Sequence, residues 1–242
     1  MILCDEFREG NDSPASRNLK FIKHCEAQLP KGKRLKYLRS DSAAYQGDII
    51  DYCEDNDIKF AIGGKLDEST VAAIKKLSSD SKNWKDYKEG FIGETVHTMN
   101  KNRYSFRLIV ISRAYQEDVF GDVDPHNKYT VIATNRTESP EQIVQWYNKR
   151  SDCSENRIKE LKIGFGMERM PCGQFKANAV FFRIGVIAYN LYKLFVNNVL
   201  YESWQNIRCK PLDGDSIKKP VKLSLMRVKS LSKLTITFMN NL

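Results

Sequence analysis

The sequence predicts an α/β fold with a β-rich middle and a helical C-terminal part. In the first third of the chain, short apolar segments alternate with segments of helical periodicity, which is typical of a sheet covered by helices. Residues 106–111 and 129–133 are rich in aromatic and β-branched side chains and are bounded by turn residues, which favours antiparallel hairpins. With 242 residues, of which 41% are hydrophobic, the chain can bury a sizeable core.

The elements of the first third follow from local signals. Strands are expected at three apolar segments, residues 1–7, 35–39 and 59–62. Ser13 and Pro14 offer an N-cap followed by a proline in the first turn, which predicts a helix start. The side chains expected on the buried side of that helix are Leu19, Ile22 and Leu29. Two more helices are expected, at residues 46–54 and 67–77.

The C-terminal part of the chain is expected to be helical. Ser139, Pro140 and Gln142 have the spacing of a capping box with proline in the first turn, which is a strong helix start. Further helices are expected at residues 155–161 and 174–195. The second contains the most apolar stretch, but it carries three polar residues that a membrane span tolerates poorly: Arg183, Asn190 and Lys193. A buried helix of a soluble protein is therefore the preferred interpretation.

Charge and cysteine usage narrow the function classes. Lys and Arg number 39 against 30 Asp and Glu, a net charge of +9, which favours a polyanionic partner, nucleic acid before membrane. Much of the excess lies in residues 205–242, where eight Lys or Arg stand against two Asp. The six cysteines are scattered, without a C-x-x-C pair or a His at metal-ligand spacing. This pattern indicates reduced thiols in a cytoplasmic protein.

One segment combines an acid with several bases. Glu155 and Lys162 are seven residues apart, so on an α-helix they share a face, with Lys159 between them. A carboxylate flanked by bases suits a metal ligand whose neighbours hold phosphates. By spacing alone, a surface helix with an ion pair between Glu155 and Lys159 is the favoured explanation of the pattern.

Ordered motifs around this segment resemble a known family. The order Tyr147, Arg150, Glu155, Lys162 resembles the Y-R-E-K signature of bacterial insertion-sequence DDE transposases of the cut-and-paste type. The run from Arg39 through Asp41 to Ser42 follows a predicted strand and resembles the second-Asp motif of that family, and residues 7–11 resemble the segment that precedes this motif. The resemblance covers about residues 1–204.

The resemblance implies a ribonuclease-H-like α/β core in which three carboxylates bind two divalent cations, Mg²⁺ or Mn²⁺, for in-line phosphoryl displacement. It implies that Asp41 and Glu155 are catalytic residues and metal ligands. It also implies that four residues contact DNA: Tyr147, Arg150, Lys159 and Lys162. The partner would be double-stranded DNA at terminal inverted repeats, in a synaptic complex that would allow a homodimer, in the cytoplasm and without a membrane.

The resemblance also predicts how the chain is divided. The family carries a mostly β insertion between its second Asp and its Glu, in the interval where the hairpin-like segments lie. Four parts are expected: a partial core at residues 1–90, a β-rich insertion at 91–135, a helical continuation of the core at 136–204, and a basic, divergent tail at 205–242.

Three departures from the family pattern shape the functional prediction. The first catalytic Asp of the family would lie before Met1, because Asp5 does not belong to the motif in which that residue is expected. Four residues separate Arg150 from Glu155 where the family has three, which in a continuous helix rotates Arg150 by about 100° unless the helix breaks. After Trp204 the likeness ends. A truncated element, inactive as an isolated chain, is therefore expected; the alternatives are a catalytically silent DNA-binding remnant and an unrelated basic nucleic-acid-binding protein.

Overall fold

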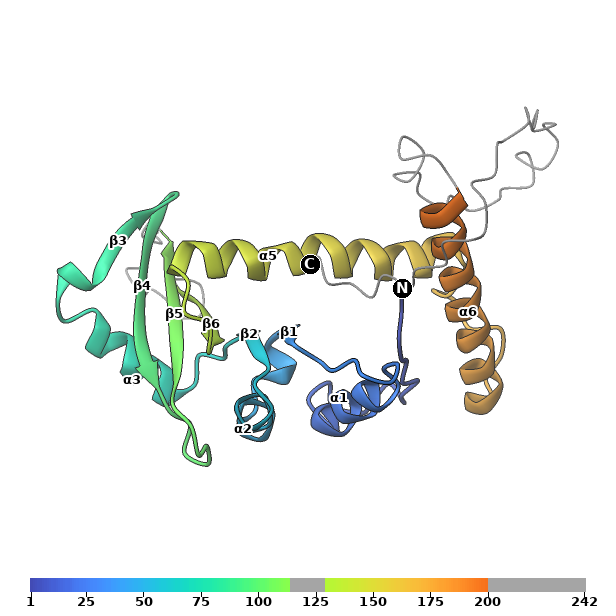
Figure 1. Cartoon of the computed structure of the whole chain (residues 1–242), viewed down its shortest axis with the longest axis horizontal. Helices are drawn as coiled ribbons and strands as arrows, with labels where there is room; N and C mark the ends of the chain where they lie inside the picture. The colour runs from blue at the N-terminus through green and yellow to red at the C-terminus, as the bar shows by residue number, and fades with distance from the viewer. Residues whose placement is uncertain (114–128, 200–242) are drawn as a thin grey trace. The chain divides into compact units, whose positions relative to one another are not determined.

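The structure is a computed structural model that describes residues 1–113 and 129–199, with the side chains of residues 150–157 excepted (Figure 1). The predicted tail at 205–242 and part of the predicted β-rich insertion lie outside the described residues. The chain divides into two compact units, one of residues 13–150 and one formed by residues 1–12 with residues from 151 onward. Each unit is considered by itself.

The larger unit is built on a six-stranded mixed sheet with the order β1-β2-β6-β5-β4-β3. The strands are β1 (Tyr37–Ser40), β2 (Lys59–Gly63), β3 (Trp84–Tyr87), β4 (Gly90–His97), β5 (Phe106–Arg113) and β6 (Tyr129–Thr134). β1 and β2 are parallel, with Arg39 opposite Ala61, whereas every other pair is antiparallel. The predicted α/β class and the predicted antiparallel hairpins are thereby confirmed.

Helices cover both faces of this sheet because its central strands bury side chains on both sides. On one face, Phe60 and Ile62 of β2 pack in a cluster with residues of α2 (Gly47–Asp55) and α3 (Glu68–Leu77), and Leu19 of α1 (Asn18–Ala27) packs against its margin. On the other face, Ala61 packs with Ile143 near the start of α5 (Pro140–Lys159). β2 therefore joins the two halves of the core.

Local capping explains two of the helix starts. The Asp67 carboxylate accepts a hydrogen bond from the Thr70 backbone N–H and begins α3, as the sequence indicates. The predicted capping box is confirmed at α5, where Ser139 Oγ accepts from the Gln142 N–H and Gln142 Oε1 accepts from the Ser139 N–H, each at 3.3 Å.

Three sequence-based expectations were wrong. Residues 1–7 form no strand. The first helix begins at Asn18 instead of at Ser13, because Ser13 opens a turn and Arg17 takes a left-handed conformation with φ 60°. A separate helix at 155–161 is replaced by one uninterrupted helix, α5, that continues to Lys159 and then widens into a π-helical turn over Glu160–Gly164. The suggested break between Arg150 and Glu155 is therefore not present.

The smaller unit pairs the N-terminal segment with α6 (Phe175–Val199). The side chain of Asn190 donates to the Ile2 carbonyl and accepts from the Ile2 N–H, each at 2.7 Å. These bonds satisfy the backbone N–H and carbonyl of Ile2, which a strand partner would otherwise satisfy. Tyr189 and Val186 form a small cluster with Leu161 and Met167.

The apolar helix α6 is buried on one side only within the described residues. Val186, Tyr189 and Val196 are buried, whereas another set of apolar side chains is 48–62% exposed: Val180, Ile184, Ile187, Leu191 and Phe195. By length and composition alone, α6 is also apolar enough to cross a membrane. The expectation of a fully buried helix was therefore wrong.

Candidate active site

Asp41 stands directly after β1 and is exposed to solvent. Its carboxylate caps the short 3₁₀ helix Ser42–Ala44, with Oδ1 accepting from the Ala43 N–H at 3.1 Å. Within the described part of the chain, Oδ2 has no hydrogen-bond partner. The turn thus holds Oδ1 in place and leaves Oδ2 available to a ligand.

Tyr147 of α5 reaches this same turn. A Cβ atom placed on Gly63, the last residue of β2, would lie 2.6 Å from Tyr147 Oη, 3.3 Å from the Ser42 nitrogen and 3.5 Å from the Asp41 carbonyl carbon. The phenol, the end of β2 and the Asp41 turn therefore meet at the carboxyl ends of the two parallel strands. The structure brings together two of the residues singled out from the sequence, Asp41 and Tyr147.

The residue before Tyr147 ties α5 to β1. Arg39 Nη1 donates to the Trp146 carbonyl at 2.6 Å, and the Arg39 guanidinium lies 4.7 Å from the centre of the indole ring. Arg136, which pairs with Glu138, lies 4.2 Å from the same ring. Such cation–π contacts stabilise a helix position when the cation is partly desolvated, and the Arg136 side chain is only 15% exposed.

The remaining signature residues lie further along the same helix or after it. Arg150 and Glu155 belong to α5, but their side chains are outside the described set. Lys159 ends α5 and Lys162 lies in the π-helical turn, and both are exposed. Because a π turn contains more residues than an α turn, the α-helical spacing assumed for Glu155 and Lys162 does not hold across Glu160.

These motifs agree with a comparison against known families. The family described as transposase DDE domain group 1 matches residues 1–224. The chain belongs to this family. No curated protein matches the chain. The resemblance to DDE transposases inferred from the motifs is thus confirmed, and with it the general process of transposition and DNA as the general substrate.

In this transposase-family chain, the described residues contain no group of three or more His, Cys, Asp or Glu side chains close enough to share a metal ion. Members of the family typically use a divalent metal. The exposed Asp41 carboxylate fits such an ion in its chemistry, because hard divalent cations prefer carboxylate oxygen and Asp41 Oδ2 is available.

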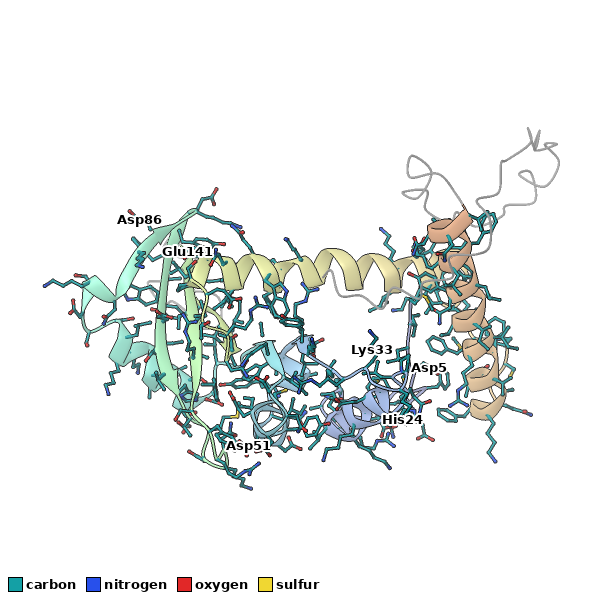
Figure 2. The ribbon with its side chains drawn as sticks, viewed as in Figure 1. Asp5, His24, Lys33, Asp51, Asp86 and Glu141 are labelled. Atoms are coloured by element: carbon teal, nitrogen blue, oxygen red, sulfur yellow. The ribbon has the colours of Figure 1, made fainter. Side chains whose placement is uncertain are left out.

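Two ionic clusters in the transposase-family chain were not found from the sequence. Asp51 of α2, labelled in Figure 2, accepts the Arg103 N–H on both carboxylate oxygens at 3.1 and 3.2 Å. Hydrogen bonds from Arg103, and then from Tyr104, hold the pKa of Asp55 below its ordinary value. The cluster fastens α2 to the β4–β5 connection, so these acids are structural and not a freely solvated face.

The second cluster lies in the smaller unit. Glu160, the first residue of the π turn, forms an ion pair with Lys193 of α6 at 2.8 Å, and both side chains are largely buried. Tyr189 donates to the same carboxylate at 3.4 Å. The sequence gives no signal for this pairing, because Lys193 lies 33 residues after Glu160 in the chain.

Proposed function

We propose that this chain takes part in the metal-dependent DNA strand cleavage and joining of transposition, to which it contributes Asp41 and Glu155 as residues that hold divalent cations. The observation that carries the proposal is the Asp41 turn. It places a solvent-exposed carboxylate oxygen at the carboxyl ends of β1 and β2, against Tyr147 of the helix that also contains Glu155. The family match supplies the reaction class.

We further propose that the core is ribonuclease-H-like. The arrangement that supports this is a parallel strand pair, β1 and β2, extended by antiparallel strands, with helices on both faces. In this proposal the strands between β2 and α5 correspond to the family's β insertion, and the boundaries expected from the sequence, at residues 90 and 135, enclose most of them.

The proposed division of chemistry follows from the side chains. When bound, Mg²⁺ or Mn²⁺ activates the attacking oxygen and stabilises the leaving oxygen of an in-line phosphoryl displacement. Asp41 and Glu155 hold the cations. Arg150, Lys159 and Lys162 neutralise DNA phosphates, and Tyr147 contacts the backbone of the transposon end. The proposed setting is the cytoplasm, with two copies of the chain in a synaptic complex.

The test is nicking of a supercoiled plasmid that carries the DNA flanking the coding sequence, with Mg²⁺ present or replaced by chelator. Asp41→Asn and Glu155→Gln should each reduce the nicking rate more than about 100-fold, since each removes a metal ligand. Asp48→Asn is the matched control, because Asp48 is an exposed acid nearby on α2. It should nick at the wild-type rate.

Two results would reject the proposal. Equal nicking by all four proteins would assign the activity to another site or to a contaminant. Specific binding of the flanking DNA without any Mg²⁺-dependent nicking would instead support the silent DNA-binding role that the sequence left open.

A further inference from the structure

We propose that Tyr147 and Gly63 form a positioning pair, in which the tyrosine hydroxyl rests in the space left by the missing glycine side chain and so sets the Asp41 turn against α5. The inference rests on the proposed function, because it concerns how the proposed metal ligand Asp41 is placed. It assigns to Tyr147 a role inside the protein in addition to the proposed DNA contact.

The first argument is steric. A methyl group at Gly63 would approach Tyr147 Oη to 2.6 Å, a separation that non-bonded carbon and oxygen atoms do not adopt. The position does not demand glycine for its backbone, because only Gly32 and Gly166 among the described glycines have positive φ. Space for the phenol, and not conformational freedom, therefore requires glycine at residue 63.

The second argument is that the contact has little freedom to relax. The Ser42 nitrogen at 3.3 Å and the Asp41 carbonyl carbon at 3.5 Å also border this space, and both are backbone atoms of the turn that orients the Asp41 carboxylate. Tyr147 cannot simply withdraw, because its ring packs against the cluster that contains Ala61 and Ile132. A bulkier residue 63 would displace the Asp41 turn.

The third argument is that α5 is held at the adjacent residue as well. The Trp146 carbonyl accepts a hydrogen bond from Arg39 at 2.6 Å, and the guanidinium groups of Arg39 and Arg136 lie 4.7 and 4.2 Å from the centre of the indole ring. Arg39 lies in β1, two residues before Asp41, which begins the turn after this strand. Residues 146 and 147 thus fix one turn of α5 to β1 and to the turn that follows it, which is the geometry a positioning pair needs.

The experiment is a double-variant cycle with Gly63→Ala and Tyr147→Phe. Phenylalanine keeps the ring and removes only the oxygen nearest to the added methyl group. Backbone amide exchange at residues 41–44, followed by mass spectrometry, reports the turn directly and needs neither DNA nor metal. Gly63→Ala alone should speed exchange there by about tenfold or more. In the Tyr147→Phe background, the same Gly63→Ala change should have almost no further effect.

Gly64→Ala is the matched control. Its added methyl group would lie 2.6 Å from Val131 Cγ2, so the close contact is equally short but involves Val131 instead of Tyr147. Tyr147→Phe should therefore not rescue Gly64→Ala. If Tyr147→Phe rescues both variants or neither, the specific pairing of Gly63 with Tyr147 is wrong.

Nicking kinetics separate positioning from simple stabilisation. Gly63→Ala should lower kcat with KM for the plasmid unchanged, and Tyr147→Phe should abolish that dependence on residue 63. If amide exchange at residues 41–44 shows coupling between Gly63 and Tyr147 but Gly63→Ala leaves kcat unchanged, the positioning role is wrong. If the wild-type chain does not nick DNA at all, the proposed function fails, whereas the exchange cycle still decides whether Tyr147 and Gly63 set the Asp41 turn.

Discussion

Replacing Arg39 with Met tests whether α5 is held to β1 as the structure indicates. Methionine keeps a long apolar stem but removes the guanidinium that donates to the Trp146 carbonyl at 2.6 Å and lies 4.7 Å from the indole centre. A hydrogen bond from a charged donor contributes about 1.5–3 kcal/mol. A cation–π contact at a partly exposed site contributes about 0.5–1 kcal/mol. Arg39→Met should therefore lower the free energy of unfolding by about 2–4 kcal/mol.

The assay is equilibrium unfolding in urea, followed by far-ultraviolet circular dichroism and by tryptophan fluorescence. Arg34→Met is the control, because Arg34 is 60% exposed and its ion-pair distance to Asp57 is 3.9 Å. An exposed pair of this kind contributes less than about 1 kcal/mol. If Arg39→Met and Arg34→Met differ by less than about 0.5 kcal/mol, the contact does not hold the helix and the anchoring argument is wrong.

Two other predictions follow from caps and buried thiols. Asp67→Ala should cost about 1 kcal/mol of unfolding free energy by removing the α3 cap. Although burial acts to raise the pKa of Asp67, hydrogen bonds from Thr70 and Ser69 bring it below its ordinary value. The wild type should therefore keep this stabilisation down to about pH 5 and lose it as the pH falls further, through the lowered pKa of Asp67, and Asp67→Ala should lose less over the same range. Burial raises the pKa of Cys53 to about 12, so iodoacetamide at about pH 8 should alkylate exposed Cys172 at least about 100-fold faster than Cys53, by peptide mass spectrometry. Equal rates would mean that the helix α2 opens readily.

Local chemistry explains which elements could be predicted from the sequence. The capping box at Ser139 acts within one turn and predicted the start of α5, and the helical periodicity of residues 67–77 predicted the start of α3 to within one residue. The strands β2, β5 and β6 could also be predicted, because each is a run of β-branched and aromatic residues bounded by turn residues.

The errors arise where distant residues decide the outcome. Residues 1–7 were expected to form a strand, but the side chain of Asn190, 188 residues away from Ile2, takes both backbone hydrogen bonds of Ile2. The exposed face of α6 could not be separated from its buried face because apolar residues occur on both. No local signal distinguishes them.

The residues of the candidate site also differ in whether the sequence could predict them. Asp41 was identified because a family motif follows a predicted strand, and Tyr147 because it opens the signature segment. Gly63 was not singled out as a site residue, because its importance depends on a tyrosine 84 residues later in the sequence. The contact of Arg39 with Trp146 spans 107 residues and has no sequence signal. A glycine that ends a buried strand beside a motif is the signal that deserved more weight.

The central proposal, that Asp41 and Glu155 hold the divalent cations of the reaction, is tested most directly by iron-mediated cleavage of the polypeptide. Fe²⁺ substituted for Mg²⁺ generates hydroxyl radicals with peroxide and ascorbate, and these radicals cut the backbone nearest the ion. The account predicts cuts close to both residue 41 and residue 155. Excess Mg²⁺ should suppress both cuts, and Asp41→Asn alone should remove both. Cuts at only one of the two positions, or cuts near residue 155 that persist in Asp41→Asn, would contradict it.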